Sequence, residues 1–452
     1  MSTATDRDGH DDRGRGRGGD LTSLLDPRSL PLRHQFGLVG LVLLAIFPLF
    51  VPTTDIPTFI GAIYLMLFAM SWDAVSGYTG QISLGHAFFF TLGGYGSAIL
   101  NIQHGLNPFL SIPIATAVAA LGGLLIGVPA LRVRGPYLAL ITLILIPITR
   151  QLFVLFSDSF LFIAPGGLGG NSGFTTPTTP LVGAQPGAVI TVGELGGLGR
   201  FVVGNLASYY VAFLLFLIVL VVLLAITRSD AGNVFKAISE DESAVAASGL
   251  NPAKFKIFAF VLSAAVGGLA GAMAVHSPAL NPLPQQLLTI ELSLTVIIAA
   301  VIGGIGTIVG AAVGAFAFEL TEFIFGLSTL QFQLPLVGQS LEDLFPLPLF
   351  LIGVLTLFFL PEGIVPGNIE LGRDALTWLR QRRGDREAAA DGGESWAETE
   401  FEPAGRRNLE ATSGPGGPSG FERTVERYRK RALEYGHDAL DRTRRVIREY
   451  RR

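Results

Sequence analysis

The chain has 452 residues, of which 50% are hydrophobic and only 15% charged, with a formal net charge of −4. Soluble domains are about a quarter charged, and their apolar runs seldom reach about 18 residues, whereas several runs here do. The absence of cysteine excludes disulfides, thiolate metal sites and cysteine nucleophiles. We therefore expect an all-α fold, that of a polytopic helical membrane protein.

The apolar runs predict about ten transmembrane helices. A polar, Arg-rich leader at residues 1–35, expected to be disordered and cytoplasmic, precedes them. The predicted spans are residues 36–51, 57–75, 84–100, 109–131, 137–156, 209–227, 257–275, 288–302, 307–325 and 346–360. Merging or splitting of the pair at 288–325 would change the count.

The distribution of Lys and Arg predicts the orientation. An even number of spans places the leader, the pair Arg132 and Arg134, the segment 228–256 and the Arg-rich C-terminal tail on one side. The loops left on the other side contain one Arg, Arg200, and no Lys. We therefore expect a multi-pass protein of the cytoplasmic membrane with both termini in the cytoplasm.

Three further polar segments lie outside the predicted spans. Residues 157–208 are rich in Gly, Thr and Pro, and predict either a surface loop or a docking face or lid on the outer side. Residues 368–419 are acidic and predict a disordered linker. Residues 420–452 predict a basic amphipathic helix, for which a place on the anionic lipid surface and a solvated tail are both open.

The stretch GYTGQISLGHAFFFTLGGYG at 77–96 predicts a helix broken by Gly77, Gly80 and Gly85. Non-helical backbone at membrane depth is tolerated only against protein or a water-filled cavity, and polar groups there usually face a pathway. The alternative is packing, with the polar groups bonded to neighbouring helices, and for His86 alone we prefer it. The candidate translocation-pathway residues are Asp73, Tyr78, Gly80, Gln81, Ser83 and His86.

The stretch GGIGTIVGAAVG at 303–314 repeats glycine at every fourth position, at Gly306, Gly310 and Gly314. Small residues let helix backbones approach closely in lipid. We therefore predict a helix-packing face and not a ligand contact, with Gly303–Gly306 forming the tight turn between two spans.

The segment 228–256 is a polar island between two apolar runs. Ser239 followed by Glu242 is typical of a capping box and predicts a helix beginning at Ser239. Gly249 should end this helix, and Asn251-Pro252 should block its continuation. A rigid helix of about ten residues beside the membrane suits the transmission of force. No GK dipeptide occurs, so a Walker A loop is absent and any ATPase must be another subunit.

Four motifs make the chain similar to the LivM-type permease subunits of branched-chain amino acid ABC importers, whose relatives include LivH and urea ABC permeases. They are GYTGQISLGHAFF at 77–89, LRVRGPYLALITL at 131–143, AISEDESAVAASGLNPAKFKIFAFVLSAAVGGLAGAM at 237–273 and IGGIGTIVGAAVGA at 302–315. The closing LPEGIVPG at 360–367 also fits. Two departures are Asp73, where the family commonly has Asn, and Pro147, where it commonly has Glu.

The resemblance implies an ABC importer transmembrane-domain fold over residues 36–367, with the coupling helix at Glu240–Gly249. It implies two ATP-binding subunits that hold ATP and Mg, a second related permease subunit and an extracytoplasmic substrate-binding protein. The chain itself is then not an enzyme, and no cofactor, metal or nucleic acid is expected on it. The residues expected to couple to the ATPase are Ser239, Glu240, Asp241, Glu242, Ala246, Gly249 and Asn251.

The implied function is alternating-access import of a branched-chain or other hydrophobic amino acid. Urea or a short amide is the alternative solute within this class. An ion-coupled secondary transporter or a channel is the alternative from another class, because broken helices suit such proteins and an ion site would then be sought among the intramembrane acids.

Overall fold

The computed structural model describes residues 32–52, 54–130, 137–160, 164–170, 172–174, 203–326, 351 and 363–365. The leader before residue 32, most of the segment 157–208, nearly all of the predicted last span and the two predicted C-terminal segments lie outside these residues. Arg132, Arg134 and Arg200 lie outside them too. The chain divides into two compact units, Met1–Leu44 and Ala45–Arg452.

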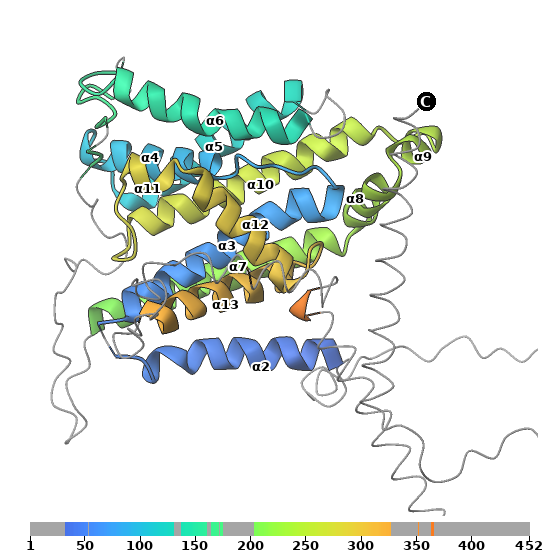
Figure 1. Cartoon of the computed structure of the whole chain (residues 1–452), viewed down its shortest axis with the longest axis horizontal. Coiled ribbons are helices and arrows are strands. Elements are labelled where there is room, and N and C mark those ends of the chain that lie inside the picture. The colour runs from blue at the N-terminus through green and yellow to red at the C-terminus, as the bar shows by residue number, and fades with distance from the viewer. Residues whose placement is uncertain are drawn as a thin grey trace, which may run out of the picture. The chain divides into compact units, whose positions relative to one another are not determined.

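The described elements are helices, which confirms the predicted class (Figure 1). An isolated bridge between Phe160 and Ala164 is the exception among the described residues. The long helices are α2 (Leu32–Ile46), α3 (Ile56–Thr79), α4 (Ala87–Ile102), α5 (Pro108–Ala130), α6 (Tyr137–Leu155), α7 (Val203–Thr227), α10 (Pro252–Val275), α12 (Ile290–Gly303) and α13 (Ile308–Gly326). The short ones are η2 (Phe47–Leu49), α8 (Asp230–Glu240), α9 (Glu242–Ala247) and α11 (Pro284–Leu287).

Five helices in the described part of the chain are long and apolar enough to cross a membrane, namely Ile56–Thr79, Pro108–Pro129, Tyr137–Leu155, Asn205–Thr227 and Pro252–Val275. The pair α12 and α13 passes the same test only together, and its two helices meet at 116°. The pair therefore forms either one broken span or a re-entrant loop. The predicted count of about ten spans stays unconfirmed, and so does the orientation that depends on its parity.

Small residues bring α4, α5 and α10 into close contact beside the buried helix α3. A β-carbon on Gly93 of α4 would collide with the carbonyl of Gly268 in α10, and one on Gly271 would collide with the carbonyl of Phe90. Such backbone-to-backbone approach is a typical source of helix association in lipid. In its most apolar window α3 is 83% buried, against 17% for α6.

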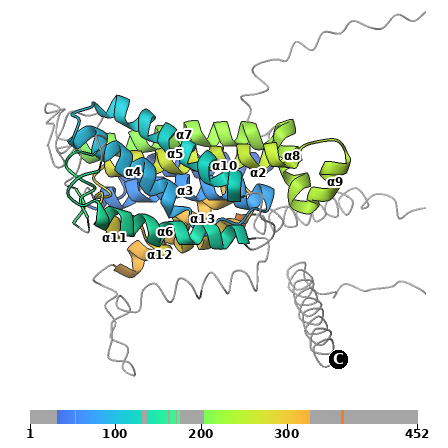
Figure 2. The same ribbon diagram turned by 90° about the horizontal axis from the view of Figure 1, so that it is seen from above.

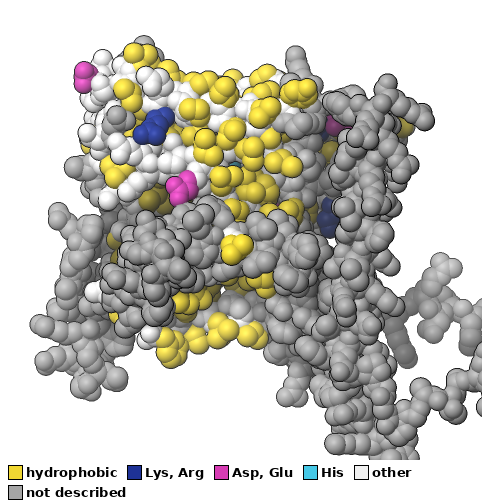
Figure 3. Space-filling model, in the orientation of Figure 1, with side chains coloured by type: hydrophobic (Ala, Val, Ile, Leu, Met, Phe, Trp, Pro, Cys, Tyr) yellow, Lys and Arg dark blue, Asp and Glu magenta, His cyan; other side chains and the backbone are white. Residues whose placement is uncertain are grey.

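The described surface suits an apolar environment. Large hydrophobic side chains remain exposed on several helices, for example Leu125 at 74% and Leu140 at 58%. Figure 3 shows such side chains over much of the face that it draws, with few charged groups among them. This is the surface expected of a protein covered by lipid or by neighbouring subunits.

Candidate coupling site and the joint beside it

The polar island folds as two short helices at one end of the bundle, α8 and α9 (Figures 1 and 2). α8 buries three residues spaced three apart, Gly232, Phe235 and Ile238. The ring of Phe235 lies 6.1 Å from that of Phe258 in α10, between centroids. This apolar stripe fixes α8 to the bundle, as expected of an amphipathic helix.

The helix start predicted at Ser239 is wrong. Ser239 lies within α8, where its hydroxyl donates to the carbonyl of Lys236 at 2.7 Å. The cap of α9 is Asp241, whose Oδ1 accepts hydrogen bonds from the amides of Ser243 at 2.8 Å and Ala244 at 3.1 Å. A carboxylate at this position satisfies unpaired amides and interacts favourably with the positive end of the helix dipole.

The pKa of the Asp241 carboxyl lies below its usual value. The hydroxyl of Ser243 has the largest effect, followed by the amides of Ala244 and Ser243. These donors favour the ionised form, because each of them bonds to a carboxylate oxygen. The ionised form of Asp241 that caps α9 is therefore stabilised by hydrogen-bond donors from α9 itself.

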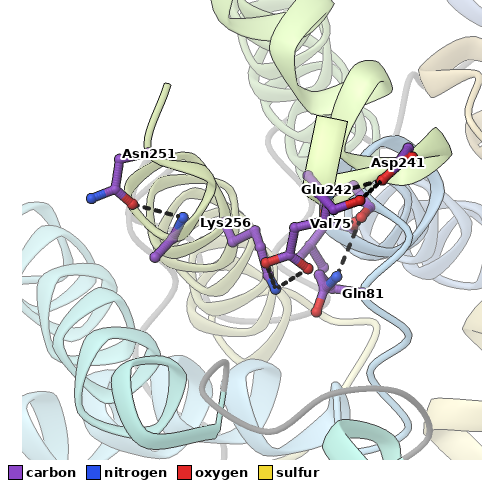
Figure 4. Close-up of polar contacts among 9 residues, drawn as sticks. Val75, Gln81, Asp241, Glu242, Asn251 and Lys256 are labelled. Atoms are coloured by element: carbon purple, nitrogen blue, oxygen red, sulfur yellow. Dashed lines mark hydrogen bonds and ion pairs between the residues drawn. The ribbon is translucent and has the colours of Figure 1, made fainter. Parts of the chain in front are cut away.

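The end predicted at Gly249 agrees with the structure, although α9 has six residues and not ten. Gly249 adopts a left-handed conformation with φ of 88°, and its amide donates to the carbonyl of Ala246 at 3.1 Å. Asn251 does more than stop a helix. Its Oδ1 accepts from the amide of Ala253 at 3.1 Å and caps α10, with Pro252 at the first helical position (Figure 4).

A salt bridge ties α9 to α10. Both carboxylate oxygens of Glu242 lie 3.1 Å from Nζ of Lys256, and the two side chains point toward each other in Figure 4. The Lys256 side chain is 4% exposed, whereas that of Glu242 is 44% exposed. Sequence reasoning missed Lys256, because no helical spacing links two residues on different helices.

The outward face of the hairpin α8–α9 remains exposed. It comprises Glu240, Asp241, Ser243, Ala244, Ala246, Ala247, Gly249 and Leu250, and Glu242 is exposed beside its salt bridge. Five predicted coupling residues, Glu240, Asp241, Glu242, Ala246 and Gly249, thus lie together on one short element. Ser239 lies before it within α8, and Asn251 lies after it and caps α10.

The break in the glycine-rich stretch lies at residues 80–86. The prediction that Gly77 breaks the helix is wrong, because α3 continues through it to Thr79. Gly80 ends it with a φ of 68°. Gly85 lies so close to α6 that a β-carbon there would collide with the carbonyl of Thr142.

Of the candidate pathway residues, Asp73, Ser83 and His86 are buried in the described part of the chain, whereas Gln81 is half-buried and Gly80 exposed. Nε2 of His86 lies 3.0 Å from the hydroxyl of Ser71 and 3.2 Å from that of Ser263. This arrangement fits the packing alternative for His86. The two serines had no sequence signal, since each is a single polar residue within an apolar helix.

The backbone of the break is held by α3 itself. Nε1 of Trp72 donates to the carbonyl of Ser83 at 2.8 Å. The hydroxyl of Ser76 donates to the carbonyl of Gln81 at 3.1 Å. The non-helical residues therefore have bonded backbone groups, as a buried segment requires.

The end of α3 also contacts the hairpin and the α12–α13 turn. Nζ of Lys236 in α8 lies 5.6 Å from the centre of the Tyr78 ring, within cation–π range. A β-carbon on Gly80 would lie 3.4 Å from that of Ser239. On another side, Oδ1 of Asp73 accepts a hydrogen bond from the amide of Gly306 at 2.7 Å.

Gly306 is not part of a helix face, so this part of the predicted packing pattern is wrong. It lies with a φ of 74° in the turn that joins α12 to α13, which confirms the tight turn predicted at Gly303–Gly306. Gly310 and Gly314 lie where α13 crosses α12, and β-carbons there would crowd Gly303. The turn is approached from a distant segment too, since a β-carbon on Gly363 would lie 2.9 Å from the carbonyl carbon of Gly303.

An apolar helical bundle with a polar hairpin at one end, beside the glycine-rich α12–α13 turn, defines a polytopic membrane protein. The chain belongs to the family of the permease component of branched-chain amino acid transport systems, whose model matches residues 58–359. The similarity inferred from the four motifs is thereby confirmed.

Several curated relatives resemble the chain. It is 31% identical over 349 residues to the high-affinity branched-chain amino acid transport system permease protein LivM of Escherichia coli, covering 74% of this chain and 76% of that protein. The LivM protein of Salmonella typhimurium is 31% identical over 287 residues, 61% of this chain and 65% of its own length. A probable branched-chain amino acid transport permease protein LivH of Methanocaldococcus jannaschii is 23% identical over 232 residues, 51% of this chain and 67% of its own length. No solved structure matches the chain.

Proposed function

We propose that the chain is the membrane-spanning subunit of an ATP-driven importer for branched-chain or other hydrophobic amino acids. Two separate ATP-binding subunits hold ATP and Mg and drive alternating access. The observation that carries the proposal is the hairpin α8–α9, which is exposed on its outer face and attached to α3 and α10 on its inner face. The names of the relatives supply the class of solute.

The hairpin has the properties that a force-receiving element needs. α9 is short, capped at Asp241 and ended at Gly249, so that it has little freedom to deform. Glu242 connects it to α10 through Lys256, and Phe235 connects α8 to α10 as well. A push on the outer face therefore moves the ends of spanning helices and not a loose loop. The energy comes from elsewhere, because the sequence holds no Walker A loop.

The proposed assembly has further parts. A second related permease subunit completes the membrane domain, and a substrate-binding protein delivers the solute at the outer face. The chain lies in the cytoplasmic membrane with both termini and the hairpin in the cytoplasm. The one-sided distribution of Lys and Arg supports this orientation.

The test uses Ala246, an exposed residue of α9 for which no side-chain bond has to be broken. Glu242 is a poorer probe, because its removal also leaves the buried ammonium group of Lys256 without its carboxylate partner. Ala246→Arg should leave the protein in the membrane but prevent co-purification of the ATPase subunits. Uptake of radiolabelled leucine should fall by at least about tenfold, the effect of losing about 1.4 kcal/mol of association energy.

Ser159→Arg is the matched control. It adds the same side chain to an exposed residue of the loop after α6, which the charge distribution predicts to be outside. This variant should remain in the membrane with its ATPase subunits bound. Normal uptake by Ala246→Arg, or a natural complex without ATPase subunits, would contradict the proposal. Competition by excess urea but not by unlabelled leucine would contradict the amino acid class.

A further inference from the structure

The carboxylate of Asp73 takes part in no step of the proposed function. This residue lies in α3 and is 0% exposed. Its Oδ1 accepts the amide of Gly306 at 2.7 Å, whereas its Oδ2 has no hydrogen-bond partner among the described residues. The side chain reaches no exposed surface in the described chain, so a role in contacting solute does not follow from its position.

The absence of a side chain at Gly77 leaves the space in which the Asp73–Gly306 hydrogen bond forms. A β-carbon on Gly77, one helical turn beyond Asp73, would collide with Oδ1 and lie 2.6 Å from the nitrogen of Gly306. Gly306 lies in the left-handed region in this half-buried turn, where its amide is outside any helix and needs an acceptor. Asp73 supplies the acceptor, and the missing side chain at Gly77 lets the two groups meet.

The turn also contacts the segment near the end of the permease region. A β-carbon on Gly363 would lie 2.5 Å from the nitrogen of Gly304, so the two backbones touch. The α12–α13 turn thus contacts both α3 and the segment Gly363–Val365. Gly363 meets the turn through the backbone, whereas the hydrogen bond that ties the turn to α3 comes from the side chain of Asp73.

The same end of α3 contacts the hairpin α8–α9. Tyr78 lies under Lys236, and Gly80 lies against Ser239. The helix is continuous from Asp73 to Thr79, so it connects the two contacts as one stiff rod of less than two turns. Displacement of α8 must therefore displace the carboxylate of Asp73.

We infer that Asp73 is a positioning residue for transport, whose side-chain oxygen locks the α12–α13 turn to α3 so that movement of the hairpin α8–α9 reaches the bent pair α12–α13. This inference rests on the proposed function. The geometry requires one acceptor oxygen and no charge. It therefore separates Asp73 from a role as the acid of an ion-coupled mechanism, which needs the carboxylate itself.

The experiment compares three variants of the full chain, each purified with its ATPase subunits and reconstituted with the binding protein. Asp73→Ala removes the acceptor, Asp73→Asn keeps an acceptor without the charge, and Asp55→Ala removes a carboxylate from the other end of α3. Asp55 makes no capping bond there, and within the described residues its carboxylate accepts a hydrogen bond from the hydroxyl of Thr54. The probe is ATP-driven uptake of radiolabelled leucine.

Asp73→Ala should reduce uptake by about tenfold or more, a typical loss when coupling between two sites is broken, with ATPase subunits still bound. Its ATP hydrolysis should continue without responding to the loaded binding protein. Asp73→Asn should keep uptake within about twofold of the natural chain, because its amide oxygen still accepts the Gly306 amide. Asp55→Ala should transport normally.

Two outcomes would overturn the inference. Normal uptake by Asp73→Ala would show that the lock is not needed. An assembled Asp73→Asn protein as inactive as Asp73→Ala would show that the charge or proton of the carboxylate acts directly. If the natural complex itself shows no ATP-driven leucine uptake, the proposed function fails, which is a different result from either of these.

A second measurement covers the case in which Asp73→Ala fails to accumulate. Ile305 lies in the turn and is 51% exposed, and the chain has no cysteine, so Ile305→Cys carries the only thiol of this subunit. Its rate of maleimide labelling in the assembled complex should differ between the nucleotide-free and the ATP–vanadate-trapped states. An equal rate in both states would overturn the inference, since the turn would not move with the ATPases.

Discussion

Removing Glu242 should destabilise the permease more than removing Lys256, although both changes break the same salt bridge. The Lys256 side chain is 4% exposed and that of Glu242 is 44% exposed. Glu242→Ala leaves a buried ammonium group without its carboxylate. Lys256→Met leaves a carboxylate that water can reach, and the methionine keeps most of the packing of the lysine stem.

The contact distance and the burial set the size of the effect. Two unit charges at the observed 3.1 Å attract each other by roughly 5 kcal/mol at an effective dielectric constant of 20 and by roughly 1 kcal/mol in water. An uncompensated buried charge costs about 3–5 kcal/mol, and the half-exposed partner reduces this, so we expect about 2–3 kcal/mol for Glu242→Ala. Lys256→Met should cost less than about 1 kcal/mol, as for an exposed ion pair.

The assay is thermal unfolding of the purified complex. About 1 kcal/mol shifts the Tm of a domain of 150–250 residues by roughly 2–4 °C, so Glu242→Ala should lower Tm by about 4–12 °C and Lys256→Met by less than about 4 °C. The double variant Glu242→Gln with Lys256→Met should recover most of the loss, because no buried charge remains. An equal or larger loss for Lys256→Met than for Glu242→Ala would refute the reasoning.

Two further predictions concern α9 and α4. Asp241→Ala should speed hydrogen exchange at the amides of Ser243 and Ala244. Because the pKa of Asp241 is lowered, the ionised cap is fully present above pH 3.8, the usual pKa of Asp, and is lost as the pH falls through the lowered pKa. Hydrogen exchange at these amides, corrected for the direct effect of pH, should therefore accelerate in that pH range in the natural chain but not in Asp241→Ala. Gly93→Ala should cost about 1–3 kcal/mol by overpacking, whereas the control Gly96→Ala gains only an ordinary contact with Ala115. Unchanged exchange, or equal Tm values for the two alanine variants, would contradict these expectations.

The apolar runs predicted where helices lie, because a helix in lipid must be apolar along its own length. They could not distinguish two spans from a bent pair. The runs 288–302 and 307–325 each satisfy the composition of a span, yet α12 and α13 meet at 116°. The bend is set by the turn between them and by its contacts with Asp73 and Gly363, which lie far away in the sequence.

The capping signal in the island was detected two residues too early. Ser239 and Asp241 are both residues that cap helices well, and local propensity does not choose between them. The choice is made by tertiary packing, since burial of Phe235 and Ile238 extends α8 through Ser239 to Glu240. Asp241 is the first residue free to adopt the extended conformation of a cap.

Glycine patterns were the least informative signal for individual roles. The fourfold spacing suggested one common face for Gly306, Gly310 and Gly314, but only the last two lie in a helix. Gly77 was expected to break a helix that runs straight through it. Each of these roles depends on which backbone approaches the glycine from elsewhere, and that information is absent from the local sequence.

The contact between Gly363 and the turn at Gly303–Gly304 also constrains how the protein is made. A polypeptide is synthesised from its N-terminus, so α12 and α13 emerge from the ribosome before the segment that contacts their turn. The contact that holds the α12–α13 turn can form only after residue 363 has been added. Chains released earlier would leave the α12–α13 turn without this contact, so the turn reaches its final surroundings only when the last part of the matched region has been made.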